Sequence, residues 1–199
     1  MKLFPHLFYL LLFFSTLTIA DQSPNKTTQL IHAAISQTKD GVIYNPTYFK
    51  IPYPNGDVPA HYGVCTDVVI RAYRKLGIDL QEQVHKDIKA NFSIYPAKRN
   101  WNQNKPDTNI DHRRVPNLQT FFTRKGKKLT VTDNPEDYKP GDLVTWMLGG
   151  KLPHIGVVVD QKSEDGKRFL IVHNVGAGPQ LEDVLFAYPI SGHYRYALD

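Results

Sequence analysis

The sequence predicts an α+β domain in which N-terminal helices pack on a C-terminal antiparallel β-sheet. The first part of the chain repeats apolar residues at helical spacing, whereas the last third contains short β-branched and aromatic runs separated by turn residues. Helices followed by a series of strands are typical of this fold class. The length of 21–199 suits a single domain with one hydrophobic core.

Four segments place their apolar residues on one side of a predicted helix. These segments are 27–38, 65–76, 80–92 and 118–124. Gly77 follows the second segment and Gly126 follows the fourth, and glycine at this place commonly ends a helix. The stretches 41–62 and 93–116 are rich in proline, polar and aromatic residues, so we expect them to be irregular.

Five short runs in the last third read as strands. They are 129–132, 143–146, 155–159, 169–172 and 193–197. Turn residues separate them, notably Pro140, Gly141 and Asp142 before the second run and Gly166 before the fourth. The short connections predict a meander of antiparallel strands.

The N-terminus predicts export. Residues 3–19 are almost continuously apolar, and small residues around Ala20 provide a cleavage site. We therefore expect a signal peptide over 1–20 and a mature protein that is periplasmic or secreted. A retained membrane anchor is the alternative, but the apolar run is short and polar residues follow it at once.

The charge distribution bears on partners. The chain has 24 basic and 19 acidic residues, a formal net charge of +5, without a long basic run. A modest positive charge favours an anionic partner such as a cell-wall polymer or a phospholipid surface, and gives nucleic-acid binding little support. We expect a monomer without a cofactor and without a membrane span after cleavage.

Cys65 is the single cysteine, so no internal disulfide can form. It lies where a predicted helix begins, after Gly63 and before Thr66 and Asp67. The dipole and free amides of a helix N-terminus lower the pKa of a thiol, which favours a nucleophile, although Asp67 would oppose this if it pointed inward. The alternative is a small buried core residue.

His154 and His173 lie at matched ends of a predicted hairpin. If Asp160 pairs with Lys167, His154 falls opposite His173 and Gly156 opposite Ile171, and opposed side chains share a face. One histidine would then contact the thiol and the other would orient it. A slip of one residue would separate them.

A zinc site is the alternative use of these residues. Cys65, His154 and His173 would provide three ligands of the types that zinc prefers. The sequence has no close ligand pair of the Cys-x-x-Cys or His-x-x-x-His type, so we expect no metal.

Three motifs in order, beginning at Gly141, Pro153 and Val172, read Gly-Asp-Leu-Val-Thr-Trp, Pro-His-Ile-Gly-Val-Val-Val and Val-His-Asn. With a cysteine at a helix start before them, they resemble the NlpC-type branch of papain-like peptidases. The resemblance implies Cys65 as nucleophile, His154 as base and His173 as orienting residue. It also implies a papain-like fold and amide hydrolysis through a thioester acyl-enzyme, with peptidoglycan stem peptides or muropeptides as substrate.

The segments 62–69, 107–118 and 192–196 resemble a family of bacterial exported proteins described only as a domain of unknown function, and the resemblance extends over nearly all of 30–199. Val64 and Thr66 flank the cysteine where typical NlpC-type enzymes have Asp-Cys-Ser-Gly, so their substrate preference does not carry over. Two other functions stay open, a non-catalytic cell-wall binding module and a papain-like lipid acyltransferase.

The segment 107–114 is dense in polar groups. Asp111, His112, Arg113 and Arg114 are candidates for a substrate-binding wall, in which an arginine would bind a carboxylate through two hydrogen bonds. A solvated loop held by Asx turns is the alternative.

Three further positions are singled out on weaker grounds. Tyr62, three residues before the cysteine, is a candidate oxyanion donor, and Asn174 with Gly176 would shape the rim after His173. The common alternatives are one tyrosine among many and a plain turn. Trp101 and Trp146 are expected to be loop or core anchors.

Overall fold

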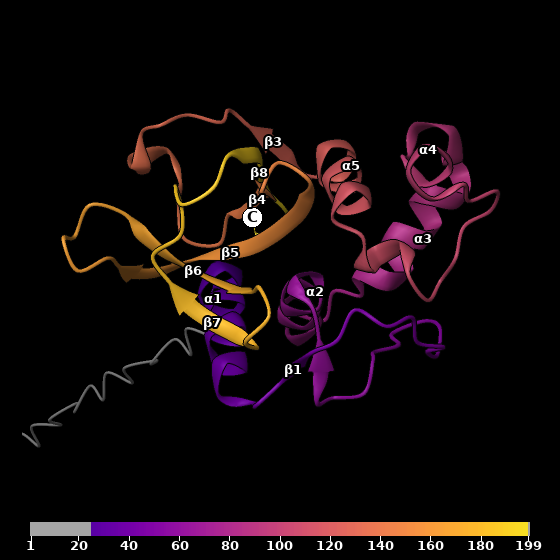
Figure 1. Cartoon of the computed structure of the whole chain (residues 1–199), viewed down its shortest axis with the longest axis horizontal. Coiled ribbons are helices and arrows are strands. Elements are labelled where there is room, and N and C mark those ends of the chain that lie inside the picture. The colour runs from indigo at the N-terminus through magenta and orange to yellow at the C-terminus, as the bar shows by residue number, and fades with distance from the viewer. Residues whose placement is uncertain (1–24, 199) are drawn as a thin grey trace, which may run out of the picture.

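Helices pack on one face of a six-stranded antiparallel sheet in the computed structural model of the protein (Figure 1). The structure describes residues 25–198, so the predicted signal peptide over 1–20 lies outside the described residues. Within the described part, no helix has the length and apolar character needed to cross a membrane. The α+β fold class and the order of helices before the sheet are confirmed.

The helices largely follow the predicted segments. They are α1 (Lys26–Ser36), α2 (Cys65–Lys75), α3 (Leu80–Ala90), α4 (Ala97–Trp101) and α5 (Val115–Lys125), with 3₁₀ turns η1 (Gln37–Lys39), η2 (Phe92–Ile94), η3 (Asp111–Arg113) and η4 (Pro135–Asp137). Two differences have local causes. The last helix begins at Val115, earlier than predicted, because Pro116 suits the first turn, where no N–H is needed. The short α4 has too few residues for an apolar period to be seen.

The sheet has the order β3-β8-β4-β5-β6-β7. Its strands are β3 (Lys127–Leu129), β4 (Leu143–Leu148), β5 (Leu152–Lys162), β6 (Phe169–Asn174), β7 (Pro179–Glu182) and β8 (Ile190–Arg195), and β1 (Ile43–Tyr44) pairs separately with β2 (Tyr62–Gly63). Four of the five predicted strands are present, whereas the predicted run 129–132 shares only Leu129 with β3, and 130–132 are not in a strand. The edge strand β7 was not predicted, because it begins with proline and lacks β-branched residues.

Two apolar clusters lie on opposite faces of the sheet. On the helix side, Ile155 and Val157 of β5 pack in one core with residues of α1, α2 and α5. On the other side, Trp146, Val158 and Ile171 form a smaller cluster. Trp146 is fully buried and its indole N–H donates to the Leu185 carbonyl at 2.9 Å, so its predicted role as a core anchor is confirmed.

The β5–β6 hairpin has a different register from the predicted one. Gly156, rather than His154, is opposite His173, and Val158, rather than Gly156, is opposite Ile171. The connecting turn lies two residues later than assumed, and the pairing is irregular between Val158 and Lys162. The prediction that the histidines are directly opposed is therefore wrong. The shift is two residues, however, so both histidines still lie on the same face.

Candidate active site

Cys65 is the first residue of helix α2, as predicted, and is 7% exposed. Val64 precedes the helix in an extended conformation, and its N–H donates to the Asp67 carboxylate at 2.7 Å. The main-chain N–H groups of Ile155, Thr66 and Cys65 itself lie against the sulfur. The helix start thus holds the sulfur beside the peptide that joins His154 to Ile155 on β5.

The thiol differs from the prediction in one respect. The pKa of Cys65 is raised to about 12. Burial is the largest cause and the nearby Asp67 carboxylate contributes to the rise, while the N–H groups at the sulfur oppose it. The expectation that the helix start would lower this pKa is wrong, because desolvation raises the pKa by more than the helix amides lower it. The thiol is protonated at neutral pH and needs a base to react.

The two histidines form a hydrogen-bonded chain with a carboxylate. His154 Nε2 lies 2.9 Å from His173 Nδ1, and His173 Nε2 lies 2.8 Å from Glu182 Oε2. The three residues come from the neighbouring strands β5, β6 and β7. His154 and His173 are almost completely buried, whereas the Glu182 side chain is 45% exposed. The structure thus brings together the predicted base and orienting residue and adds Glu182.

The chemical character of the partners determines which nitrogen donates in each of these two hydrogen bonds. The Glu182 carboxylate accepts, so His173 Nε2 carries a proton and donates it in the hydrogen bond. In a neutral His173, Nδ1 then accepts from the Nε2–H of His154. His154 Nδ1 is left with a free lone pair. That nitrogen can accept a proton.

Both histidines are held in the neutral state. Burial lowers the pKa of His154 to about 3, and the neighbouring His173 adds to the effect. Burial also lowers the pKa of His173, but here the Glu182 carboxylate opposes the shift. Both imidazoles are therefore unprotonated at neutral pH and able to accept a proton, and a pKa of about 3 makes His154 a weaker base than a histidine with a pKa near 7.

The Cys65 sulfur and the His154 ring lie on different faces of the sheet, next to the same strand β5. His154 is paired with Trp146 and their ring centroids are 5.9 Å apart, so its ring lies on the face opposite the helices. Cys65 belongs to the cluster on the helix side, and its sulfur lies at the Ile155 N–H, one residue after His154. Among residues 25–198, the hydrogen bonds join His154 to His173 but not to the Cys65 sulfur. Such contacts are often long before substrate binds.

A cleft of about 350 Å³ opens at Cys65. Its walls are mostly apolar and are formed by Tyr44, Pro46, Val64, Trp101, Ile110, Val115, Pro116, Leu152 and Pro153, together with Arg113 and Arg114. The pKa of Tyr44 is raised by burial first, and then by Cys65 and Asp67, so its phenol belongs to the same site. The predicted oxyanion donor Tyr62 is absent from the lining and instead stacks on Phe49.

Arg113 is a structural residue rather than a free substrate contact. Its guanidinium binds both oxygens of Asp67 at 2.9 Å, and both side chains are nearly inaccessible. The ion pair offsets the Asp67 charge in the first turn of the nucleophile helix. Arg114 differs, because it lines the cleft with its guanidinium 4.0 Å above the Trp101 ring and donates to Gln103 at 2.6 Å.

The other predicted binding residues hold the structure together. Asp111 is buried and accepts from Gln103 and from the Asp107 amide. His112 is buried, which lowers its pKa to about 3. Asn174 is buried and joins the end of β6 to the carbonyl of Gly63 at 3.3 Å. Each of these three side chains is enclosed and lies outside the lining of the cleft at Cys65.

The grouping of possible metal ligands bears on the predicted absence of a metal. Within residues 25–198, no three His, Cys, Asp or Glu side chains are grouped so that they would hold a metal ion. His154 Nε2 and both ring nitrogens of His173 take part in hydrogen bonds with protein groups.

Comparisons with known proteins identify the family. The sequence pattern of the domain of unknown function DUF1287 matches residues 31–196. The chain belongs to the DUF1287 family. It is also 48% identical over 179 residues to the uncharacterized protein YijF of Escherichia coli (strain K12), a match that covers 90% of this chain and 86% of that protein. Membership of a family of unknown function is confirmed, and the relation of this DUF1287 domain to NlpC-type peptidases stays a prediction.

The neutral histidines lead to a prediction about pH. The His154 ring signals in an NMR titration should show no protonation near pH 6.5 and should move only as the pH approaches 3. Because the unfolded chain binds this proton near pH 6.5, the free energy of unfolding should fall as the pH is lowered below 6.5. A His154→Asn variant assigns the signal. A titration of His154 close to pH 6.5 would contradict the buried neutral base.

Proposed function

We propose that this protein is an exported cysteine hydrolase that cleaves amide bonds in peptidoglycan stem peptides. The observation that supports it best is the hydrogen-bonded series from His154 through His173 to Glu182, together with the Cys65 sulfur held at the N–H of Ile155, the residue after His154. A nucleophile, a base and an orienting group in this order are the parts that nucleophilic acyl transfer requires. A core cysteine has no need of them.

The proposed acylation step transfers one proton and forms one bond. As the Cys65 sulfur attacks the amide carbonyl carbon, the thiol proton passes to His154 Nδ1. The imidazolium that forms is stabilised by His173 and, through it, by the Glu182 carboxylate. The leaving amine takes that proton when the carbon–nitrogen bond breaks, which leaves a thioester on Cys65. Water then attacks the thioester with His154 again as base, and the acid product leaves.

The oxyanion of the intermediate needs hydrogen-bond donors. The main-chain N–H groups at the start of helix α2 lie at the sulfur, and the dipole of the helix favours negative charge there. Tyr44, which shares the cleft, is the side chain that we propose as a further donor in place of Tyr62.

The substrate class rests on charge and chemistry. The chain has a net positive charge, and a guanidinium lines the cleft beside the nucleophile. Peptidoglycan stem peptides carry carboxylates, which bind guanidinium groups through paired hydrogen bonds. The resemblance to NlpC-type enzymes points to the same class of substrate.

A lipid acyltransferase is the second candidate, and the cleft wall is the observation that favours it. Most of the residues around Cys65 are apolar, and Leu152 and Trp101 are partly exposed at its rim. Such a wall would also accept an acyl chain in a thioester. A non-catalytic cell-wall binding module is the third reading and predicts that Cys65 is dispensable.

The first prediction concerns the nucleophile and the base. Digestion of purified peptidoglycan with the mature protein should release new muropeptides, detected by mass spectrometry, and Cys65→Ala and His154→Ala should each abolish the release. The activity should survive EDTA, because no metal is assigned a role. Release of fatty acid from phospholipid vesicles without muropeptide cleavage would support the acyltransferase instead. Full activity of Cys65→Ala would refute both enzymes.

A second prediction concerns Glu182 as a positioning residue. Glu182→Gln keeps a hydrogen-bond acceptor for His173 but removes the charge that stabilises the imidazolium, so kcat should fall about 10-fold. The acid limb of the kcat/KM profile should also move to lower pH, because the carboxylate raises the pKa of His173. Asp183→Asn, on the adjacent residue, breaks only an exposed pair with Arg168 and is the control. An unchanged pH profile would leave Glu182 with no role in proton transfer.

A third prediction distinguishes the role of Arg114 from that of Arg113. Arg114→Ala should lower kcat/KM about 10- to 150-fold for a muropeptide with a free carboxylate, and much less for its amidated form. Arg113→Ala should instead lower the free energy of unfolding by about 3–5 kcal/mol, because it leaves Asp67 charged and buried without its partner. Urea unfolding and steady-state kinetics distinguish the two effects. Equal losses on free and amidated substrates would exclude carboxylate binding by Arg114.

A further inference from the structure

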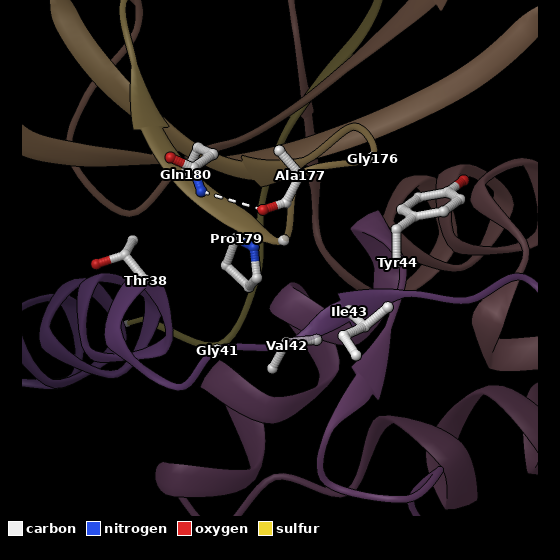
Figure 2. Close-up of a pocket in the computed structure, with 10 residues that line it drawn as sticks. Thr38, Gly41, Val42, Ile43, Tyr44, Gly176, Ala177, Pro179 and Gln180 are labelled. Atoms are coloured by element: carbon white, nitrogen blue, oxygen red, sulfur yellow. Dashed lines mark hydrogen bonds between the residues drawn. The ribbon is translucent and has the colours of Figure 1, made fainter.

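A second groove lies on the other side of Tyr44 from Cys65. Its volume is about 370 Å³, and Tyr44 lines both this groove and the cleft at the nucleophile. Figure 2 shows its two walls, the segment Gly41 to Tyr44 on one side and the turn from Gly176 to Gln180 on the other. A ligand that occupies the cleft at Cys65 can therefore continue past Tyr44 into this groove.

The main chain of β1 presents an open edge to the groove. The N–H groups of Ile43 and Asn45 donate to β2, at 2.8 and 3.1 Å. Alternate residues of a strand direct their N–H and C=O to opposite edges, so those of Tyr44 point away from β2. The hydrogen bonds of the described residues leave these two groups of Tyr44 unpaired. They are available to a ligand.

The position of Gly178 shows what lies opposite the open edge of β1. A Cβ placed on Gly178 would lie 2.5 Å from the carbonyl oxygen of Val42, which points to the same edge of β1 as the carbonyl of Tyr44. Gly178 has a φ of +86°, so a residue with a side chain would be strained there as well as blocked. The turn after β6 thus lies directly across from the open edge and closes the groove at Val42.

The lining of the groove is small and uncharged. It contains no Lys, Arg, Asp or Glu among its ten residues, and four of these are Gly or Ala. The side-chain amide of Gln180 donates to the Ala177 carbonyl at 3.3 Å, across the turn itself (Figure 2). The groove contrasts with the cleft on the Cys65 side, where Arg114 provides a charge. It suits main chain with small neutral side chains.

We propose that this groove binds an extended, uncharged segment of the substrate peptide by adding it as a strand to the open edge of β1. One residue of the ligand exchanges two main-chain hydrogen bonds with Tyr44, and its small side chain lies against the turn at Ala177. The inference rests on the proposed function and deepens it. The substrate is a peptide with a charged part beside Cys65 and Arg114 and an alanine-like part beyond Tyr44.

The first test uses binding and needs no catalysis. The probe is acetyl-Ala-Ala-Ala-amide, of either chirality, titrated by NMR into the full mature protein that carries Cys65→Ala. Shifts should map to 41–44 and 176–180. N-methylation of the one alanine that pairs with Tyr44 should weaken binding about 2- to 10-fold, the equivalent of one hydrogen bond. N-methylation of either neighbour should have little effect, because those N–H groups point away. Three equal responses, or shifts elsewhere, would overturn the proposal.

The second test uses matched variants on intact substrate. Ala177→Trp fills the groove and should raise KM for a long muropeptide while kcat for a truncated substrate that ends at Tyr44 stays unchanged. Val175→Trp, at an exposed residue outside the lining, is the control. If the parent protein cuts no muropeptide but the alanine peptide binds with the alternating pattern, the proposed function fails and the groove stands. If the parent cuts and both variants behave alike, the groove fails.

A third outcome would also overturn the proposal. An open strand edge can pair with the same edge of a second copy of the chain. A concentration-dependent dimer in light scattering, abolished by Ala177→Trp, would assign the groove to self-association.

Discussion

The buried ion pair between Asp67 and Arg113 is the interaction on which the candidate site depends. Asp67 uses one carboxylate to accept from the Val64 N–H at the start of helix α2 and to bind the Arg113 guanidinium. Thr66 adds a bond from its hydroxyl to the Arg113 carbonyl. The pair therefore joins the helix that carries Cys65 to the segment that forms a wall of its cleft. Since both charges are enclosed, neither side can move without leaving a charge unpaired.

The sheet supplies the other half of the site through its strand order. His154, His173 and Glu182 come from three strands that are adjacent in both sequence and space. Gly156, opposite His173, allows this arrangement, because a Cβ there would lie 2.5 Å from the Ile171 side chain and 3.2 Å from the His173 Cβ. The hydrogen-bonded series runs from the buried His154 ring to the half-exposed Glu182 carboxylate, which places a negative charge at its solvent end.

The parts of the site that have a local sequence pattern can be predicted from the sequence. Cys65 was identified from the helix start, and the two histidines from their places in neighbouring strands. The same reasoning missed Glu182, because its edge strand lacks the residues that mark strands. It also misassigned Arg113, because the partner that buries it lies 46 positions away in the sequence. Tyr44 carries no signal at all, since only the tertiary fold brings residues 41–44 to the cleft. The predicted register of the β5–β6 hairpin differs from the observed one by two residues. Because this number is even, the two histidine side chains still lie on the same face of the sheet.

The burial of Cys65 also bears on how its thiol resists oxidation. Oxidants attack the thiolate and not the thiol. With a pKa of about 12, on the order of one molecule in 10⁵ carries a thiolate at pH 7. A sulfenic acid or a mixed disulfide should therefore form slowly at Cys65, even though the chain has no second cysteine to resolve it. The desolvation that makes the sulfur a poor nucleophile thus also favours its reduced form.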